Sequence, residues 1–173
     1  MSLILNEEQV QLQDSAKSYV GDNWTVGELR KMRTATGKGY SETLWAKAAE
    51  LGWLAIPFEE AYGGLGLGYA ELGIVLEELG RGLVVLPILS SVVLGGGAVQ
   101  LGGSEEQKKA WLPKVSDGSA ILTLASQESA QHDPHRVTTV AVKDGSGWRL
   151  NGRKVLVPDG HAADQIVDRK SVV

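Results

Sequence analysis

The sequence contains no cysteine among its 173 residues. Disulfide bonds and thiol chemistry are therefore excluded, and a small secreted fold held together by disulfides is excluded with them. The absence also fits a reducing compartment, and we expect a cytoplasmic protein.

The sequence also lacks an excess of basic charge, since it has 17 basic and 21 acidic residues. This balance argues against nucleic acid as a partner. The start of the chain, Met1 to Glu8, lacks the basic and apolar blocks of a signal peptide. One long stretch without charge, Gly82 to Gly103, has the length of a membrane span. Its six glycines and Pro87 favour a buried core helix instead, and we expect no membrane span.

The first two thirds of the chain have the periodicity of helices. Asn6 to Gln9 and Ser104 to Gln107 have the spacing of capping boxes. An apolar stripe with i, i+3, i+4, i+7 spacing predicts one helix clearly, through Leu72, Val75, Leu76 and Leu79. The pattern weakens over Gly21 to Lys38, where we expect a loop.

After Gly118 the period changes to that of strands. Four strands are predicted, over residues 120–125, 137–142, 148–150 and 153–157. Asp144-Gly145 and Asn151-Gly152 have the composition of tight hairpin turns. The sequence therefore predicts an α+β fold: an all-α helical domain over 1–118, then an incomplete antiparallel β-barrel-like domain over 119–167. We expect residues 168–173 to reflect a truncation or a non-native tail, because Asp168-Arg169-Lys170 interrupts an apolar run.

Several motifs of the sequence resemble motifs of one protein family and follow one another in the same order. The segment Pro57 to Gly68 resembles the P-E-E-Y-G-G-L-G-L-G loop of the acyl-CoA dehydrogenases. Leu150 to Lys154 resembles the family's L-N-G-x-K motif, and Gly160 to Asp164 its G-x-x-A-D turn. The glycine loop is not a dinucleotide fingerprint, since Tyr69 stands where that pattern needs glycine and no strand precedes it.

The resemblance implies an FAD-dependent enzyme that oxidises an acyl-CoA thioester to the trans-2-enoyl-CoA. It also implies electron-transfer flavoprotein as the electron acceptor and a homo- or hetero-oligomeric assembly. The family's catalytic glutamate lies in a C-terminal domain beyond these motifs. The resemblance therefore assigns no catalytic residue to this chain, which we expect to be inactive alone.

Two segments correspond to the family's flavin contacts, and both depart from its pattern. Gln127 stands in place of a threonine, Leu156 in place of a tryptophan and Pro158 in place of a second threonine. The cofactor-binding residues that the resemblance implies are Leu124, Ser126, Gln127, Leu156, Val157 and Pro158. His132 occupies the position of a serine that contacts the thioester ligand.

Four other interpretations stay open at this point. Glu128 is either a structural carboxylate, which we favour, or a general base. His132-Asp133-Pro134-His135 hints at a metal site, although a solvated loop is favoured and no metal is expected. The whole chain could also belong to a non-catalytic supporting subunit of a mixed assembly, or to a binding module without redox function.

Overall fold

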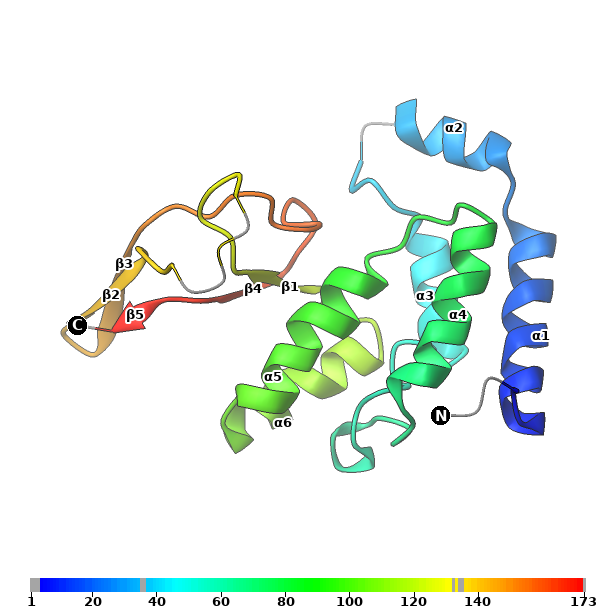
Figure 1. Cartoon of the computed structure of the whole chain (residues 1–173), viewed down its shortest axis with the longest axis horizontal. Helices are drawn as coiled ribbons and strands as arrows, with labels where there is room; N and C mark the ends of the chain where they lie inside the picture. Colours follow the sequence, from blue (N-terminus) through cyan, green and yellow to red (C-terminus); the bar gives the residue numbers. More distant parts are fainter. Residues whose placement is uncertain (1–3, 35–36, 132, 134–135, 173) are drawn as a thin grey trace.

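The computed structural model describes residues 4–34, 37–131, 133 and 136–172. A helical part comes first and a smaller β-part follows it (Figure 1). The α-helices are α1 Glu7–Asn23, α2 Val26–Thr34, α3 Glu42–Glu50, α4 Tyr69–Arg81, α5 Gly97–Gly102 and α6 Glu105–Ser116. A 3-10 helix, η1 Glu60–Tyr62, and a π-helix, η2 Leu89–Gly96, complete the helical part. The strands are β1 Leu122–Ala125, β2 Val140–Asp144, β3 Gly147–Asn151, β4 Gln165–Asp168 and β5 Ser171–Val172.

Both predicted capping boxes are confirmed. At the start of α1 the Asn6 side chain accepts a hydrogen bond from the Gln9 backbone, and the Gln9 side chain accepts one from the Asn6 backbone. Ser104 and Gln107 make the same pair of contacts at the start of α6. Each box satisfies two backbone N–H groups that have no partner inside the helix.

The predicted loop over Gly21 to Lys38 is wrong for its middle part, which forms α2. Residues of this helix are all exposed or half-buried, so it has no apolar stripe that the sequence could reveal. Local contacts hold it instead. The Thr25 hydroxyl accepts from the Glu28 backbone, and Lys31 pairs with Glu28 one turn on.

The loop between α3 and α4 turns back on its own backbone. The Phe58 side chain is fully buried, and its carbonyl accepts from the Gly66 N–H at 2.8 Å. The Tyr62 hydroxyl donates to Glu105 at 2.7 Å and so ties the loop to α6. The core around it joins α1, α3, α4 and η2 through buried side chains, among them Trp45, Trp53, Leu54, Ile56, Leu72, Val75 and Val92.

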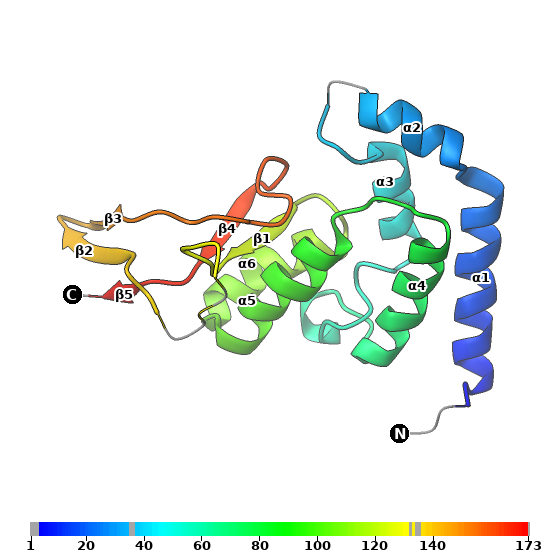
Figure 2. The ribbon, with the colours of Figure 1, turned by 45° about the horizontal axis from the view of Figure 1, so that its top comes forward.

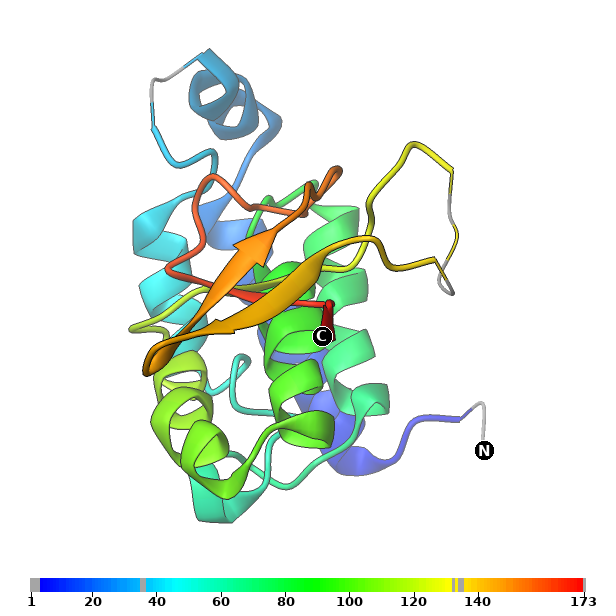
Figure 3. The ribbon, with the colours of Figure 1, turned by 90° about the vertical axis from the view of Figure 1, so that its left-hand side faces the viewer.

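The β-part lies at the end of the helical part that is remote from α1 (Figures 1 and 2). Seen from that end, its strands lie in front of the helices (Figure 3). β2 and β3 form an antiparallel hairpin around the predicted Asp144-Gly145 turn, which is confirmed. β1 pairs with β4 and β2 with β5, and both of these pairs are parallel. The helical domain and the start of a β-domain are thus confirmed, while the antiparallel pairing holds only for the hairpin.

The predicted fourth strand over residues 153–157 is wrong, and so is the hairpin at Asn151-Gly152. Leu156 adopts a φ of 51°, which is incompatible with a strand. Pro158 has no N–H to continue a ladder. β4 ends at Asp168, which pairs with Ala125 of β1. After two intervening residues the chain forms β5, which pairs with β2. Among the described residues, no helix is both long and apolar enough to cross a membrane.

Candidate functional site

The two segments that the sequence assigns to a flavin lie side by side in the structure. The Val155 N–H donates to the Gln127 carbonyl at 2.9 Å. Four residues before Gln127, the buried Thr123 hydroxyl of β1 donates to the Pro158 carbonyl at 2.6 Å. The segments 123–127 and 155–158 are therefore joined at two points, whose partners lie 28 and 35 residues apart in the sequence. The sequence prediction that both segments contribute to one site is geometrically consistent with this arrangement.

The structure places three of the predicted cofactor residues half-buried and three exposed. Leu124 is half-buried within β1, opposite Val167 of β4. Gln127 and Val157 are half-buried, whereas Ser126, Leu156 and Pro158 are exposed. The side chains of Ser126 and Gln127 have no hydrogen-bond partner among the residues that the structure describes. His132 lies outside the described residues.

Leu156 is the most unusual of these residues. Its side chain is 72% exposed, and its φ of 51° lies in the left-handed region that branched residues avoid. It borders an open hollow of about 360 Å³, lined by Glu128, Ser129, Ala130, Arg153, Val155 and Leu156. An apolar side chain held outward in a strained backbone beside an open hollow suits contact with a flat apolar face of a ligand.

Glu128 has the contacts of a structural carboxylate. One oxygen accepts from Lys154 Nζ at 2.7 Å and from the Thr139 N–H at 3.0 Å. The other accepts from the Thr138 N–H at 2.6 Å and from the Thr138 hydroxyl. Lys154 first, then Thr138 and Thr139, hold the pKa of this carboxyl well below its usual range. A carboxylate so occupied is a poor proton acceptor, which favours the structural interpretation over the general base.

The depressed pKa of Glu128 predicts a specific acid sensitivity. Because the folded pKa lies below the unfolded one, its contribution to stability is complete above the unfolded value near 4.5 and is lost as pH falls below it. We expect wild-type stability to fall between about pH 5 and pH 3. In Glu128→Gln this part of the decline should be absent. Urea unfolding across that range measures it, and equal slopes for both proteins would contradict the expectation.

Other polar residues fix the β-part to the helices, and sequence reasoning assigned them no role. The Ser90 hydroxyl of η2 donates to the Asp159 carboxylate at 2.6 Å, and the buried Ser91 hydroxyl accepts from the Leu122 N–H at 3.0 Å. Within the β-part, the Asp164 carboxylate accepts from the Ile121 N–H at 2.8 Å and so ties the residue before β4 to the residue before β1. The sequence offered one signal for these contacts. Ser90 and Ser91 lie within the uncharged run Gly82 to Gly103, and hydroxyl groups buried in such a run require hydrogen-bond partners.

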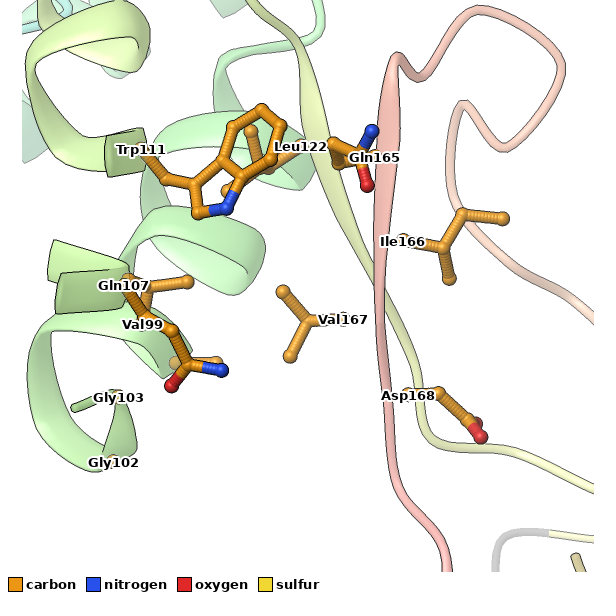
Figure 4. A pocket seen from close by; sticks show the side chains of 11 residues that line it. Val99, Gly102, Gly103, Gln107, Trp111, Leu122, Gln165, Ile166, Val167 and Asp168 are labelled. Carbon is orange, nitrogen blue, oxygen red and sulfur yellow. The ribbon is translucent and has the colours of Figure 1, made fainter. Parts of the chain in front are cut away.

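A separate cavity of about 410 Å³ lies between α5, α6 and β4 (Figure 4). Trp111 and Gln107 of α6 face Val167 of β4 across it, while Ile166 points away. None of the predicted cofactor residues lines this cavity. We therefore place the candidate site at the hollow beside Leu156. The metal interpretation gains no support, since the described residues contain no cluster of three or more His, Asp or Glu ligands, and His132 and His135 lie outside them.

Comparison with known proteins identifies this architecture. The family model described as "Acyl-CoA dehydrogenase, N-terminal domain" matches residues 6–119. The chain is 35% identical to acyl-CoA dehydrogenase FadE12 of Mycobacterium tuberculosis over 161 residues, which cover 90% of this chain and 40% of FadE12.

Solved structures agree with this match. The ChsE4–ChsE5 complex from Mycobacterium tuberculosis aligns with a TM-score of 0.86 and 29% identity over 99% of this chain and 46% of the other. A glutaryl-CoA dehydrogenase from Mycobacterium smegmatis in complex with FADH2 aligns with a TM-score of 0.85 and 25% identity over 97% of this chain and 43% of the other.

A helical bundle continued by the first strands of a β-domain is thus the architecture of the N-terminal part of acyl-CoA dehydrogenases. The chain belongs to the acyl-CoA dehydrogenase family. It spans less than half the length of the relatives it matches.

Proposed function

We propose that the chain supplies the helical domain, ending near Gly118, and the first part of the β-domain of an FAD-dependent acyl-CoA dehydrogenase. Such an enzyme oxidises an acyl-CoA thioester to the trans-2-enoyl-CoA and passes electrons to an electron-transfer flavoprotein. The observation that carries the proposal is the junction of the two candidate flavin segments at Val155 and Gln127, with Leu156 exposed beside it. Family membership and the FADH2 complex of a relative support it.

FAD would supply the hydride acceptor for this reaction. The chain's own residues would hold its ring. Leu156 offers an apolar contact for a ring face, and the Gln127 amide can both donate to and accept from a polar edge. Ser126 adds a hydroxyl that makes no hydrogen bond to any residue that the structure describes. Pro158 offers no N–H, and its carbonyl is already taken by Thr123. We propose no catalytic base in this chain and assign that role to the rest of the protein.

A second candidate is a supporting subunit of a mixed acyl-CoA dehydrogenase assembly that does not itself turn over substrate. The departures favour it, because Leu156 has no aromatic ring to pack on the flavin and Pro158 has neither a hydroxyl nor an N–H. Ser129, which stands where the resembling motif has a proline, is a third departure. A solved complex of ChsE4 with ChsE5, to which this chain is similar, supports the possibility of mixed assembly.

One experiment separates the two candidates. The full-length protein is purified without added flavin, and its absorbance spectrum is followed during anaerobic addition of a panel of CoA thioesters. Flavin bands that bleach with one thioester are expected if the protein is a working dehydrogenase. A colourless protein that also takes up no added FAD would overturn that proposal and favour the supporting subunit.

A further inference from the structure

Lys154 lies at the centre of a shielded group of charges. Its side chain is only 12% exposed, and that of Glu128 only 9%. The ammonium group contacts Glu128 at 2.7 Å and Asp168 at 3.3 Å, and it also donates to the Arg169 carbonyl. One cation therefore faces two carboxylates, a pattern in which loss of the cation leaves two like charges shielded from water.

The contacts of this ammonium join segments that are far apart in the sequence. Glu128 directly follows Gln127, and Lys154 directly precedes Val155, so the ion pair flanks the backbone hydrogen bond between the two candidate flavin segments. Asp168 ends β4. Glu128 in turn holds Thr138 and Thr139, just before β2. The ammonium thus fixes both candidate segments against the two short sheets.

Backbone pairing cannot replace this link. Between residues 152 and 158 the described chain forms no strand, and a single backbone hydrogen bond, from Val155, connects it to the segment after β1. The strained conformation of Leu156 lies two residues from Lys154. A strained φ persists only where its surroundings overdetermine it, and here the ion pair on one side and the Thr123–Pro158 hydrogen bond on the other provide that constraint.

We propose that Lys154 is a positioning residue, which sets the separation of the two candidate flavin segments and the outward orientation of Leu156. It acts through Glu128 and Asp168 and not by touching the ligand. The identity of that ligand as FAD rests on the proposed function, whereas the positioning itself does not.

The positioning is tested without any cofactor, by hydrogen exchange with mass spectrometry on the 173-residue chain. In Lys154→Met we expect peptides covering 126–131 and 153–158 to exchange about tenfold faster, while peptides from α1 and α4 are unchanged. Lys154→Arg, which keeps the charge, should restore most of the protection. Lys143→Met removes an exposed lysine of β2 and should leave both segments as in the wild type. Unchanged exchange of both segments in Lys154→Met would overturn the proposal, and so would uniform acceleration over the whole chain.

A second measurement connects the positioning to the ligand. Titration with FAD, followed by quenching of flavin fluorescence, should show affinity lowered about fivefold in Lys154→Met and recovered in Lys154→Arg. If the wild-type chain binds no FAD, the titration is repeated on the full-length protein, whose failure to bind would overturn the proposed function, and the exchange result still decides whether Lys154 positions the segments. If the wild type binds FAD and Lys154→Met binds it equally well, the positioning proposal is wrong and the proposed function stands.

Discussion

Replacing Gly64 with alanine is expected to lower the free energy of unfolding by roughly 1–3 kcal/mol or more. A Cβ at this position would lie 2.0 Å from the Phe58 carbonyl oxygen and 2.2 Å from its carbonyl carbon. Both are backbone atoms, so no rotamer change can relieve the overlap. The same carbonyl accepts from Gly66, and the Phe58 side chain is fully buried. Any backbone shift that makes room must therefore disturb the loop and the core together.

Gly73 provides the matched control for this substitution. It is exposed in the interior of α4, and a Cβ there meets no atom within 4 Å. Alanine is a better helix former than glycine by up to about 1 kcal/mol, so Gly73→Ala should leave stability unchanged or raise it. Urea unfolding followed by circular dichroism measures both variants. A Gly64→Ala protein as stable as Gly73→Ala would show that the loop is not packed as described.

The glycine loop also shows what the sequence could and could not predict. Its resemblance to the family motif located a loop, the apolar stripe after it predicted a helix, and both are present. The resemblance did not distinguish the glycines. Gly63 and Gly66 need glycine because of their positive φ, whereas Gly64 needs it because a backbone carbonyl approaches it from six residues away. Such an approach depends on tertiary packing, which no local pattern records.

Dependence on local or on distant residues also separates the elements that the sequence predicted correctly from those that it predicted wrongly. The starts of α1 and α6 depend on residues three apart, so their capping boxes were readable. The parallel pairing of β1 with β4 joins residues 43 apart, Leu122 and Gln165, and no periodicity encodes it. The segment before Pro158 has the apolar composition of a strand but is fixed by contacts to Glu128 and Thr123 from elsewhere in the chain.

For the candidate site, the resemblance located two segments, and the structure shows how they are joined. The departures Gln127 and Leu156 were visible in the sequence. The exposure of Leu156 was not visible, because it lies within the continuous apolar run Val155 to Val157, which favours a buried strand. Lys154 was recognised only as part of a motif. Its role depends on two carboxylates, Glu128 and Asp168, whose positions follow from the fold.

Leu156→Gly is expected to stabilise the fold and to weaken FAD binding at the same time. A branched residue in the left-handed region costs roughly 1–2 kcal/mol, which glycine avoids. Glycine loses more backbone entropy on folding, which offsets roughly 0.5–1 kcal/mol of that gain. The net expectation is a rise of up to about 1 kcal/mol in the free energy of unfolding. The leucine side chain is mostly exposed, so its removal sacrifices little packing within the chain.

The expected loss of FAD affinity follows from the same exposure. If the ring packs on Leu156, removing that side chain removes about 1.5 kcal/mol or more of apolar contact, a reduction in affinity of about tenfold or more. Leu83→Gly is the matched control. Leu83 has a φ of 55° just after α4, is 54% exposed and is far from the candidate site in sequence, so its substitution should relieve similar strain without changing affinity.

Thermal unfolding and FAD titration of both variants give the four values that decide the interpretation. Two stabilised proteins, of which only Leu156→Gly binds FAD weakly, would mean that the strain at Leu156 is maintained for a ligand contact that Leu83 does not make. Equal affinity in both variants would remove Leu156 from the site. The hollow beside it would then be a gap in the described surface and not a place for the flavin ring, even if the chain binds FAD elsewhere.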